Sequence, residues 1–185
     1  KMTLERLNEI KKLLNEYKEA KSAGFETRPT IIGPYTFLVL ADYKSGATKD
    51  TVLSDVIVAF QTLLKELNQL GVEWLQIEEP ALVLDQTEEE KKLFVSIYEE
   101  LLKSKNNLNI LLQTYFGDVR DSYKEIIKLD FDGIGLDFIE GRDSLALIQK
   151  YGFPKKKILF AGLVNGKNIW RNNYQKTLEL LTALD

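Results

Sequence analysis

Acidic side chains end a short apolar run near the middle of the chain, in the stretch from Glu73 to Asp85. Gln76, Glu78 and Glu79 lie in this run, which stops at Pro80. Acids are depleted in strands and in protein interiors, so two in succession need a reason. Either the strand simply emerges into water here, or its end lines an active-site face, as the carboxyl ends of barrel strands do.

Every apolar run of this kind ends in polar or small residues, namely Gly33-Pro34, Glu78-Glu79, Thr114-Tyr115, Asp137 and Asn165. If the runs are parallel strands, their ends gather at one edge of a sheet. Glu78 and Asp137 would then form a carboxylate pair that shares a proton, binds a cationic amine or holds a metal. Each single position also has an ordinary explanation, because strands must end in something polar. The agreement of all five ends is what favours a site.

Side chains alternate along the run of residues 73–79, because a strand points successive side chains to opposite faces. One face carries Trp74, Gln76 and Glu78, and the other carries Leu75, Ile77 and Glu79. We expect the first face to line a barrel interior, and Leu75 and Ile77 to pack against helices. An interior Gln or Glu near the mouth is a structural hydrogen-bonding partner about as often as it contacts a ligand.

The segment after the last apolar run contains Gly166, Lys167 and Asn168, followed by Trp170 and Arg171. Backbone N–H groups of such a segment can hold an anion, but the spacing of a phosphate loop is missing and an ordinary turn is expected. Trp170 and Arg171 could stack on an aromatic ligand. Packing of Trp170 against a neighbouring helix is the simpler expectation.

The composition excludes several classes of function. The 185 residues include no cysteine and no histidine, so the chain has no thiol nucleophile and lacks the usual zinc ligands. The net charge of −3 argues against nucleic acid or an anionic membrane as partner. Neither a membrane-spanning run nor a signal peptide is evident, which predicts a cytoplasmic protein. The chain begins at Lys1, not Met, and is therefore expected to be a piece of something longer.

The periodicity of apolar residues predicts an α/β fold of parallel (βα) units. We expect strands over residues 30–32, 73–77, 108–113, 133–138 and 158–163, and helices over 2–23, 37–41, 52–70, 88–102, 119–129, 144–151 and 175–184. The first helix carries an apolar stripe of Leu4, Leu7, Ile10, Leu14 and Tyr17. Residues 1–185 then form a single incomplete portion of a TIM (βα)8 barrel, because a closed barrel needs eight strands. A small open doubly wound sheet is the alternative, although no nucleotide-binding glycine motif is present.

Five strings at the predicted strand ends carry a family resemblance. They are IIGPYTFL at residues 31–38, WLQIEEPALVLD at 74–85, LLQTYFG at 111–117, GLDFIEG at 135–141 and AGLVNGKNIWR at 161–171. In order and spacing they resemble the N-terminal domain of cobalamin-independent methionine synthase. The resemblance covers the whole chain, and it matches the middle and later part of that domain.

The resemblance implies an enzyme with two (βα)8 barrels that look like an ancient duplication. It implies that the C-terminal barrel, in cis, binds zinc and homocysteine and receives a methyl group from 5-methyltetrahydropteroyl-triglutamate to form methionine. The N-terminal barrel is then mainly a scaffold that helps to hold the folate. Residues that contact folate in this family lie mostly upstream of the segment. The segment alone is accordingly expected to be inactive.

The implied duplication allows a comparison between the two barrels. Glu78 stands where the catalytic half has a substrate-binding acid, and residues 113–116 stand where that half has two zinc ligands. We therefore expect no catalytic residue, no metal ligand and no cofactor within this chain. If any substrate contact exists, we expect it at the face formed by the strand ends, at Glu78, Thr114, Tyr115 and Asp137.

Two other functions stay open. One is a stand-alone binding module for folate or another anion, for which Lys44, Lys167 and Arg171 would be the cations at the mouth. The other is a small enzyme that uses Glu78 and Asp137 as acid and base. Whatever the function, an incomplete barrel would leave the first and last strands with unpaired edges, which predicts an edge-mediated dimer or partial disorder of the isolated chain.

Overall fold

A computed structural model describes residues 2–44 and 46–184, together with their side chains except those of residues 2–7 and 9. Its centre is one parallel sheet with the strand order β1-β2-β3-β4-β5. The strands are β1 (Thr30–Ile32), β2 (Trp74–Glu78), β3 (Asn109–Gln113), β4 (Gly133–Asp137) and β5 (Ile158–Gly162). Because all strands are parallel and neighbours in sequence order, their carboxyl ends meet at one edge, as predicted.

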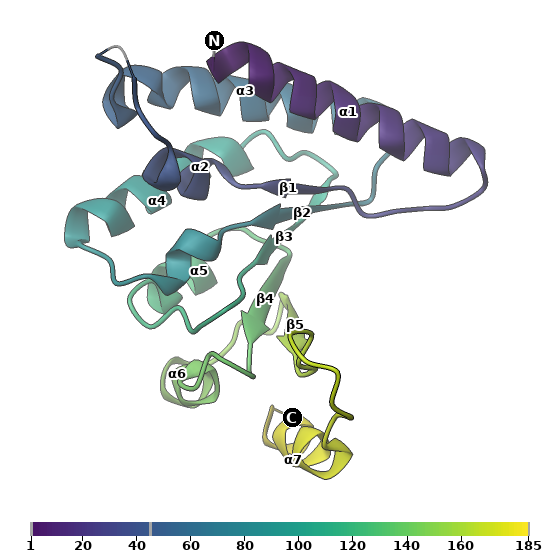
Figure 1. The fold of residues 1–185 in the computed structure, drawn as a ribbon, viewed down its shortest axis with the longest axis vertical. Helices are drawn as coiled ribbons and strands as arrows, with labels where there is room; N and C mark the ends of the chain where they lie inside the picture. The colour runs from purple at the N-terminus through teal and green to yellow at the C-terminus, as the bar shows by residue number, and fades with distance from the viewer. Residues whose placement is uncertain (1, 45, 185) are drawn as a thin grey trace.

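Helices follow the strands in the alternation that the sequence predicts. They are α1 (Met2–Ser22), α2 (Pro34–Leu40), α3 (Lys49–Gln69), α4 (Glu88–Leu102), α5 (Tyr123–Lys128), α6 (Ser144–Tyr151) and α7 (Tyr174–Leu184), with a short 3-10 helix η1 (Pro80–Val83) after β2. Figure 1 shows α2, α4, α5 and α6 on one side of the sheet, while α1 lies beside α3 at the β1 end. The other side of the sheet carries no helix in the described part of the chain. The arrangement is that of part of a TIM barrel, cut open.

The core lies between the sheet and its helices. Leu75 and Ile77 are fully buried in this core, whereas Trp74, Gln76 and Glu78 are half-buried on the opposite face. The predicted alternation of β2 is therefore confirmed. Of the predicted α1 stripe, Ile10, Leu14 and Tyr17 are buried; the side chains of Leu4 and Leu7 are outside those that the structure describes.

The helix-free face of the sheet is curved like the inside of a barrel. Near the amino ends of the strands, the rings of Trp74 on β2 and Phe160 on β5 meet edge to face with centroids 5.8 Å apart, although two strands separate them. The guanidinium of Arg28 lies 5.2 Å from the centre of the Phe160 ring. These side chains line a pocket of about 370 Å³ on the concave side, which is separate from the carboxyl ends of the strands.

Two helices begin with reciprocal caps. Thr87 caps α4 in a capping box: its side chain accepts from the Glu90 backbone N–H, while the Glu90 side chain accepts from the Thr87 N–H. Thr48 and Thr51 form a similar box at the start of α3. That box lets α3 begin at Lys49, three residues before the predicted start.

The predicted helix over residues 119–129 was too long, since α5 covers only Tyr123–Lys128. Side chains just before it bind elsewhere: Asp121 accepts from the Gln86 backbone N–H at 2.9 Å, and Ser122 donates to the Gln86 side chain. Such side-chain bonds compete with helix formation at the chain segment that carries them. None of the helices in the described ranges has the length and hydropathy that a membrane span needs.

Candidate functional site

A pocket of about 420 Å³ opens at the carboxyl ends of β3, β4 and β5. We call it the strand-end pocket. It is lined by Gln113, Thr114, Tyr115, Phe116, Leu136, Asp137, Ile139, Glu140, Gly162, Val164, Asn165, Gly166 and Lys167. Three of the four predicted site residues, Thr114, Tyr115 and Asp137, belong to this lining. The fourth, Glu78, does not line the pocket but is bonded to it through Tyr115.

Asp137 ends β4 and ties two loops together. Its Oδ2 atom accepts from the backbone N–H of Phe116 at 2.9 Å, and its Oδ1 atom accepts from the N–H groups of Ile139 at 2.7 Å and Glu140 at 3.0 Å. Three backbone donors thus surround one carboxylate. The three bonds give Asp137 a structural role at the rim of the pocket, because they hold the loops after β3 and β4 together.

Thr114 ends β3 and is almost completely buried. Its hydroxyl donates to the carbonyl oxygen of Gly135 on β4 at 2.9 Å, and its backbone N–H donates to the same oxygen at 3.1 Å. The neighbouring Gln113 side chain folds over Gly135, where an added Cβ would lie 2.1 Å from the Gln113 Oε1 atom. Thr114 therefore positions the loop after β3, and its hydroxyl is already committed.

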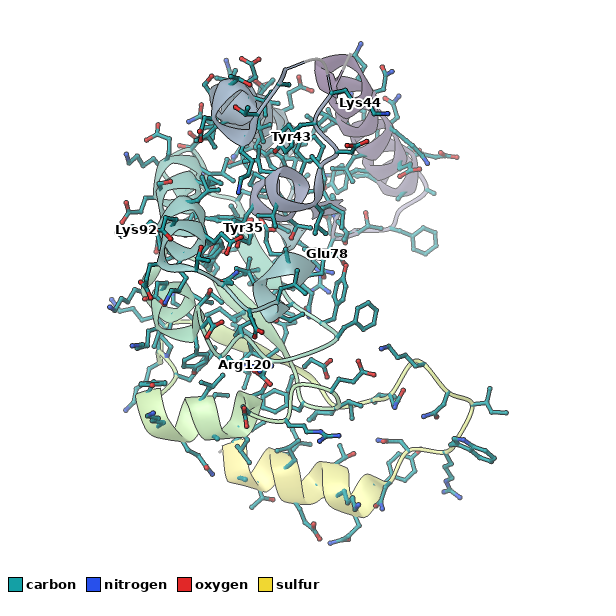
Figure 2. All side chains as sticks on the ribbon, turned by 60° about the vertical axis from the view of Figure 1, so that its left-hand side comes forward. Tyr35, Tyr43, Lys44, Glu78, Lys92 and Arg120 are labelled. Atoms are coloured by element: carbon teal, nitrogen blue, oxygen red, sulfur yellow. The ribbon has the colours of Figure 1, made fainter. Side chains whose placement is uncertain are left out.

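Tyr115 and Glu78 are brought together from adjacent strands. The Tyr115 hydroxyl donates to Glu78 Oε2 at 3.1 Å, and the Gln76 side-chain amide donates to Glu78 Oε1 at 2.9 Å. Burial, with the Glu78 charge second, raises the pKa of Tyr115 to about 12, so the hydroxyl stays protonated and able to donate. Both side chains are half-buried, and Figure 2 shows Glu78 on the open, concave side of the C-shaped chain.

Phe116 has an unusual backbone for a residue other than glycine, with φ of 70°. The bond from its N–H to Asp137 helps to hold this left-handed conformation, which costs on the order of 1–3 kcal/mol. The residue is 59% exposed, and Lys167 Nζ lies 4.2 Å from the centre of its ring. The same ammonium bonds both oxygens of Glu140, at 2.8 Å and 2.7 Å. A cation, an anion and an exposed ring thus form the outer rim of the pocket.

Glu79, the second of the two successive acids at the end of β2, was not among the predicted site residues, yet its carboxylate accepts three hydrogen bonds. It is fully buried on the helix side of the sheet. Its carboxylate accepts from the backbone N–H groups of Tyr35 at 3.0 Å and Thr36 at 2.6 Å, and from the Tyr98 hydroxyl at 2.5 Å. The first two donors belong to the start of α2, where the N-cap residue Gly33 supplies no side-chain bond. Glu79 therefore caps α2 from another strand.

Burial raises the pKa of Glu79 to about 7, and its hydrogen bonds from Thr36 and Tyr98 act in the opposite direction. The signal in the sequence was the pair Glu78-Glu79 followed by proline. Alternation assigned Glu79 to the helix face, and a buried acid on that face needs donors. The predicted helical turn over residues 37–41 was late because this cap, with Pro34 at the first helical position, starts α2 earlier.

The predicted basic side chains do not gather at the pocket. Lys167 lines the rim, but its ammonium is already paired with Glu140. Lys44 Nζ lies 3.7 Å from Asp42 Oδ2. Figure 2 shows Lys44 beside Tyr43, at the opposite end of the molecule from β5. Arg171 lies over the ring of Tyr174.

Trp170 does not pack against a neighbouring helix, as had been expected, because 78% of its surface is exposed. The expected turn at Gly166 and Lys167 is present.

The side chains do not offer a zinc site. The sequence contains neither histidine nor cysteine, and among the described residues no three carboxylates come together in a way that could hold a metal ion. The carboxylates at the strand ends are instead bonded to backbone N–H groups, amides, a hydroxyl or a lysine. The side chains at these strand ends therefore do not suit a zinc ion such as the one that the resemblance implies for the C-terminal barrel.

The family described as "Cobalamin-independent synthase, N-terminal domain" matches residues 3–185. The chain belongs to this family. The resemblance read from the five strand-end strings is thereby confirmed, as is the α/β fold of parallel units.

Two similar curated relatives carry the same name, 5-methyltetrahydropteroyltriglutamate–homocysteine methyltransferase. The relative from Lactococcus lactis subsp. cremoris (strain SK11) is 76% identical over 173 residues, which is 94% of this chain and 23% of that protein. The relative from Streptococcus suis (strain 05ZYH33) is 49% identical over 185 residues, covering 98% of this chain and 25% of that protein. This family member thus spans about a quarter of the length of the relatives that it matches.

Proposed function

We propose that this chain is one segment of the non-catalytic N-terminal barrel of a methyltransferase. The complete enzyme would transfer a methyl group from 5-methyltetrahydropteroyl-triglutamate to homocysteine and give methionine. Its C-terminal barrel, in the same polypeptide, would hold zinc and carry the reaction. The observation behind this proposal is the 76% identity to a methyltransferase of which the chain covers only 23%.

The side chains at the strand ends support a role without catalysis. Asp137 and Thr114 are used to fasten loops and strands to one another. The donor set does not suit zinc, so every step that needs this metal would belong to other parts of the enzyme. We propose that residues 1–185 act as a single incomplete barrel segment. Its cytoplasmic location stays a prediction from composition.

Within the segment, we propose that any contact with the substrate is made at Glu78, Thr114, Tyr115 and Asp137. Thr114 and Asp137 would position the loops, because their polar atoms are already bonded to the backbone. Glu78 and Tyr115 would make the contact itself, because both are half-buried on the open face and joined by one hydrogen bond. The folate, with its glutamate tail, is the substrate that the resemblance assigns to this barrel.

The competing functions have less support. An acid–base pair of Glu78 and Asp137 would need a carboxylate free to exchange a proton, whereas three backbone donors hold Asp137. A stand-alone anion-binding module would need free cations at the mouth. Of the three that were predicted, Lys167 is paired with Glu140 and Lys44 with Asp42.

Methionine formation by the complete enzyme and by the 185-residue chain tests the proposal. We expect activity from the complete enzyme and none from the chain alone, with homocysteine and methyl-folate triglutamate as substrates. Methionine produced by the isolated chain would overturn the assignment.

The contact residues need a separate measurement in the complete enzyme. Tyr115→Phe should raise KM for the methyl-folate by about tenfold if its hydroxyl serves a charged group, and leave kcat unchanged. Tyr151→Phe, on the distant helix α6, is the matched control and should change neither constant. An unchanged KM in Tyr115→Phe would show that the Tyr115 hydroxyl does not contact the methyl-folate. The assignment of the chain to the N-terminal barrel would not be affected.

A further inference from the structure

The loop after β5 contains the dipeptide Asn165-Gly166, and nowhere else in the sequence does an asparagine precede a glycine. We propose that Asn165 is a site of spontaneous deamidation. This slow covalent modification needs no enzyme and would occur at the rim of the strand-end pocket. The proposal does not depend on the function of the complete enzyme. It rests on the chemistry of this dipeptide and on three features of its surroundings.

The reaction balances without a cofactor. The backbone nitrogen of Gly166 loses its proton to solvent base and attacks Cγ of the Asn165 side chain. The bond between Cγ and the amide nitrogen breaks, ammonia leaves, and a five-membered succinimide ring forms. Water then opens the ring at either carbonyl, so that the residue becomes aspartate or, when the chain runs through Cγ, isoaspartate. The net change is uptake of one water and loss of one ammonia.

The first feature is the side-chain carbonyl that is to be attacked. The Oδ1 atom of Asn165 accepts from the backbone N–H of Lys167 at 2.9 Å. This bond folds the side chain back along the following backbone, which contains the attacking nitrogen. It also withdraws electron density from Cγ, so that the carbon becomes a better electrophile.

The second feature is the freedom around the attacking residue. No heavy atom lies within 4 Å of the place where a Cβ of Gly166 would be, and the residue is exposed. Glycine also has the widest range of backbone conformations, which closure of the ring requires. Solvent base and water therefore reach this peptide unit, and the neighbouring atoms do not block its rotation.

The third feature becomes clear when Asn165 is compared with two other residues of the chain, Asn168 and Asp132. Asn168 makes the same kind of bond, from the Trp170 N–H to its Oδ1 at 3.0 Å, but Ile169 follows it, whose branched side chain hinders attack. Asp132 also precedes a glycine, but it has no side-chain amide to lose, Gly133 begins β4, and Asp132 Oδ2 accepts from the Ile110 N–H at 2.9 Å. Asn165 alone among these three combines the bonded carbonyl, the following glycine and a loop outside the sheet.

The modification would change the pocket rim. Lys167 stands two residues later and pairs with Glu140 while covering the Phe116 ring. A carboxylate at residue 165 would compete for this ammonium. The isoaspartate product would also lengthen the backbone by one carbon between β5 and Lys167. Ageing of the protein would therefore loosen the rim contact between the β4 and β5 loops.

The test is incubation of the folded 185-residue chain in mildly alkaline buffer, followed by peptide mass spectrometry with synthetic aspartate and isoaspartate standards. We expect Asn165 to convert before Asn168, with isoaspartate among the products. In Gly166→Ala, conversion should slow by about tenfold or more, which corresponds to about 1.4 kcal/mol on the barrier. No neighbouring atom opposes this substitution, so the variant should fold.

The comparison of Asn165 with Asn168 needs no variant, because both lie in one loop of the wild-type chain. Conversion of Asn165 no faster than Asn168 would overturn the proposal. So would an unchanged rate in Gly166→Ala. The same incubation in denaturant measures the contribution of the fold: conversion more than about tenfold faster in the unfolded chain would mean that the native loop protects Asn165, and would also refute the proposal.

Discussion

The carboxylate of Glu79 occupies the space beside Gly33 that any larger residue would need. A Cβ added to Gly33 would lie 2.1 Å from the Glu79 Oε1 atom. The two residues come from different (βα) units, and Gly33 directly precedes the helix that Glu79 caps. The buried acid and the glycine therefore form one tertiary unit that fixes the start of α2 against the end of β2.

Gly33→Ala should destabilise the chain by about 1–3 kcal/mol, because the new methyl group must displace a fully buried side chain. Urea unfolding followed by circular dichroism measures this loss. Gly166→Ala is the matched control, since no atom lies within 4 Å of its added Cβ, and it should stay within about 0.5 kcal/mol of the wild type. Equal stability of the two variants would show that Glu79 can move aside.

Glu79→Gln should also destabilise the chain. The three groups that bond to the carboxylate are all donors, namely the N–H groups of Tyr35 and Thr36 and the Tyr98 hydroxyl. A side-chain amide would turn a donor toward them, leaving at least one buried group unpaired at a cost of about 1–3 kcal/mol. Glu89→Gln, exposed in the first turn of α4, supplies the control in the same unfolding assay.

The stability that depends on Glu79 should change with pH. Its pKa is raised from 4.5 to about 7 by burial, so between these values the native state binds a proton that the unfolded state has released. Stability therefore falls as pH rises through this window. The free energy of unfolding of the wild type, relative to Glu79→Gln, should drop by on the order of 3 kcal/mol from about pH 4 to about pH 8. A relative stability that rises over the same range would mean that the three donors outweigh burial.

The sequence predicted most elements because their signals are local. The predicted helix over residues 88–102 coincides with α4, which starts at a local capping box, and the alternation along β2 assigned Leu75 and Ile77 to the core. The boundary of α2 could not be predicted in the same way. Its cap comes from Glu79, more than forty residues away in sequence, and no local pattern encodes such a contact.

The candidate site was predictable in position but not in chemistry. Parallel strands in sequence order bring Thr114, Tyr115 and Asp137 to one edge, as the sequence indicated. What each polar atom does depends on neighbours from other strands. The three backbone donors around Asp137 and the carbonyl partner of Thr114 are visible only after folding. Whether these residues contact a substrate stays a prediction.

Asp137→Asn should loosen the loop that contains Phe116. The amide keeps the shape of the carboxylate but cannot accept at both ends, so at least one of the N–H groups of Phe116, Ile139 and Glu140 loses its partner. Because the Phe116 backbone is strained, its amide should exchange with solvent at least about tenfold faster, a change of about 1.4 kcal/mol in the local opening free energy. Asp143→Asn, whose side chain makes no capping bond, should leave this exchange rate unchanged.

The isolated chain should associate through the edges of its sheet. β1 and β5 are the terminal strands of the sheet, and each leaves one row of backbone groups without a neighbouring strand among the described residues. Such edges invite pairing with another chain. At β5 the first residue, Ile158, is 52% exposed, so an apolar side chain accompanies the unpaired backbone.

Sedimentation velocity over a range of concentrations should therefore show dimers or larger species of the 185-residue chain. Ile158→Lys should shift the distribution toward monomer, because charged side chains, lysine above all, oppose edge pairing. Lys156→Ile makes the opposite substitution, from lysine to isoleucine, in the loop before β5. Because this position lies outside the strand, the substitution should change the distribution of species less. A monomeric chain whose β1 and β5 amides are nevertheless protected from hydrogen exchange would contradict this prediction, because the edges would then be covered from within.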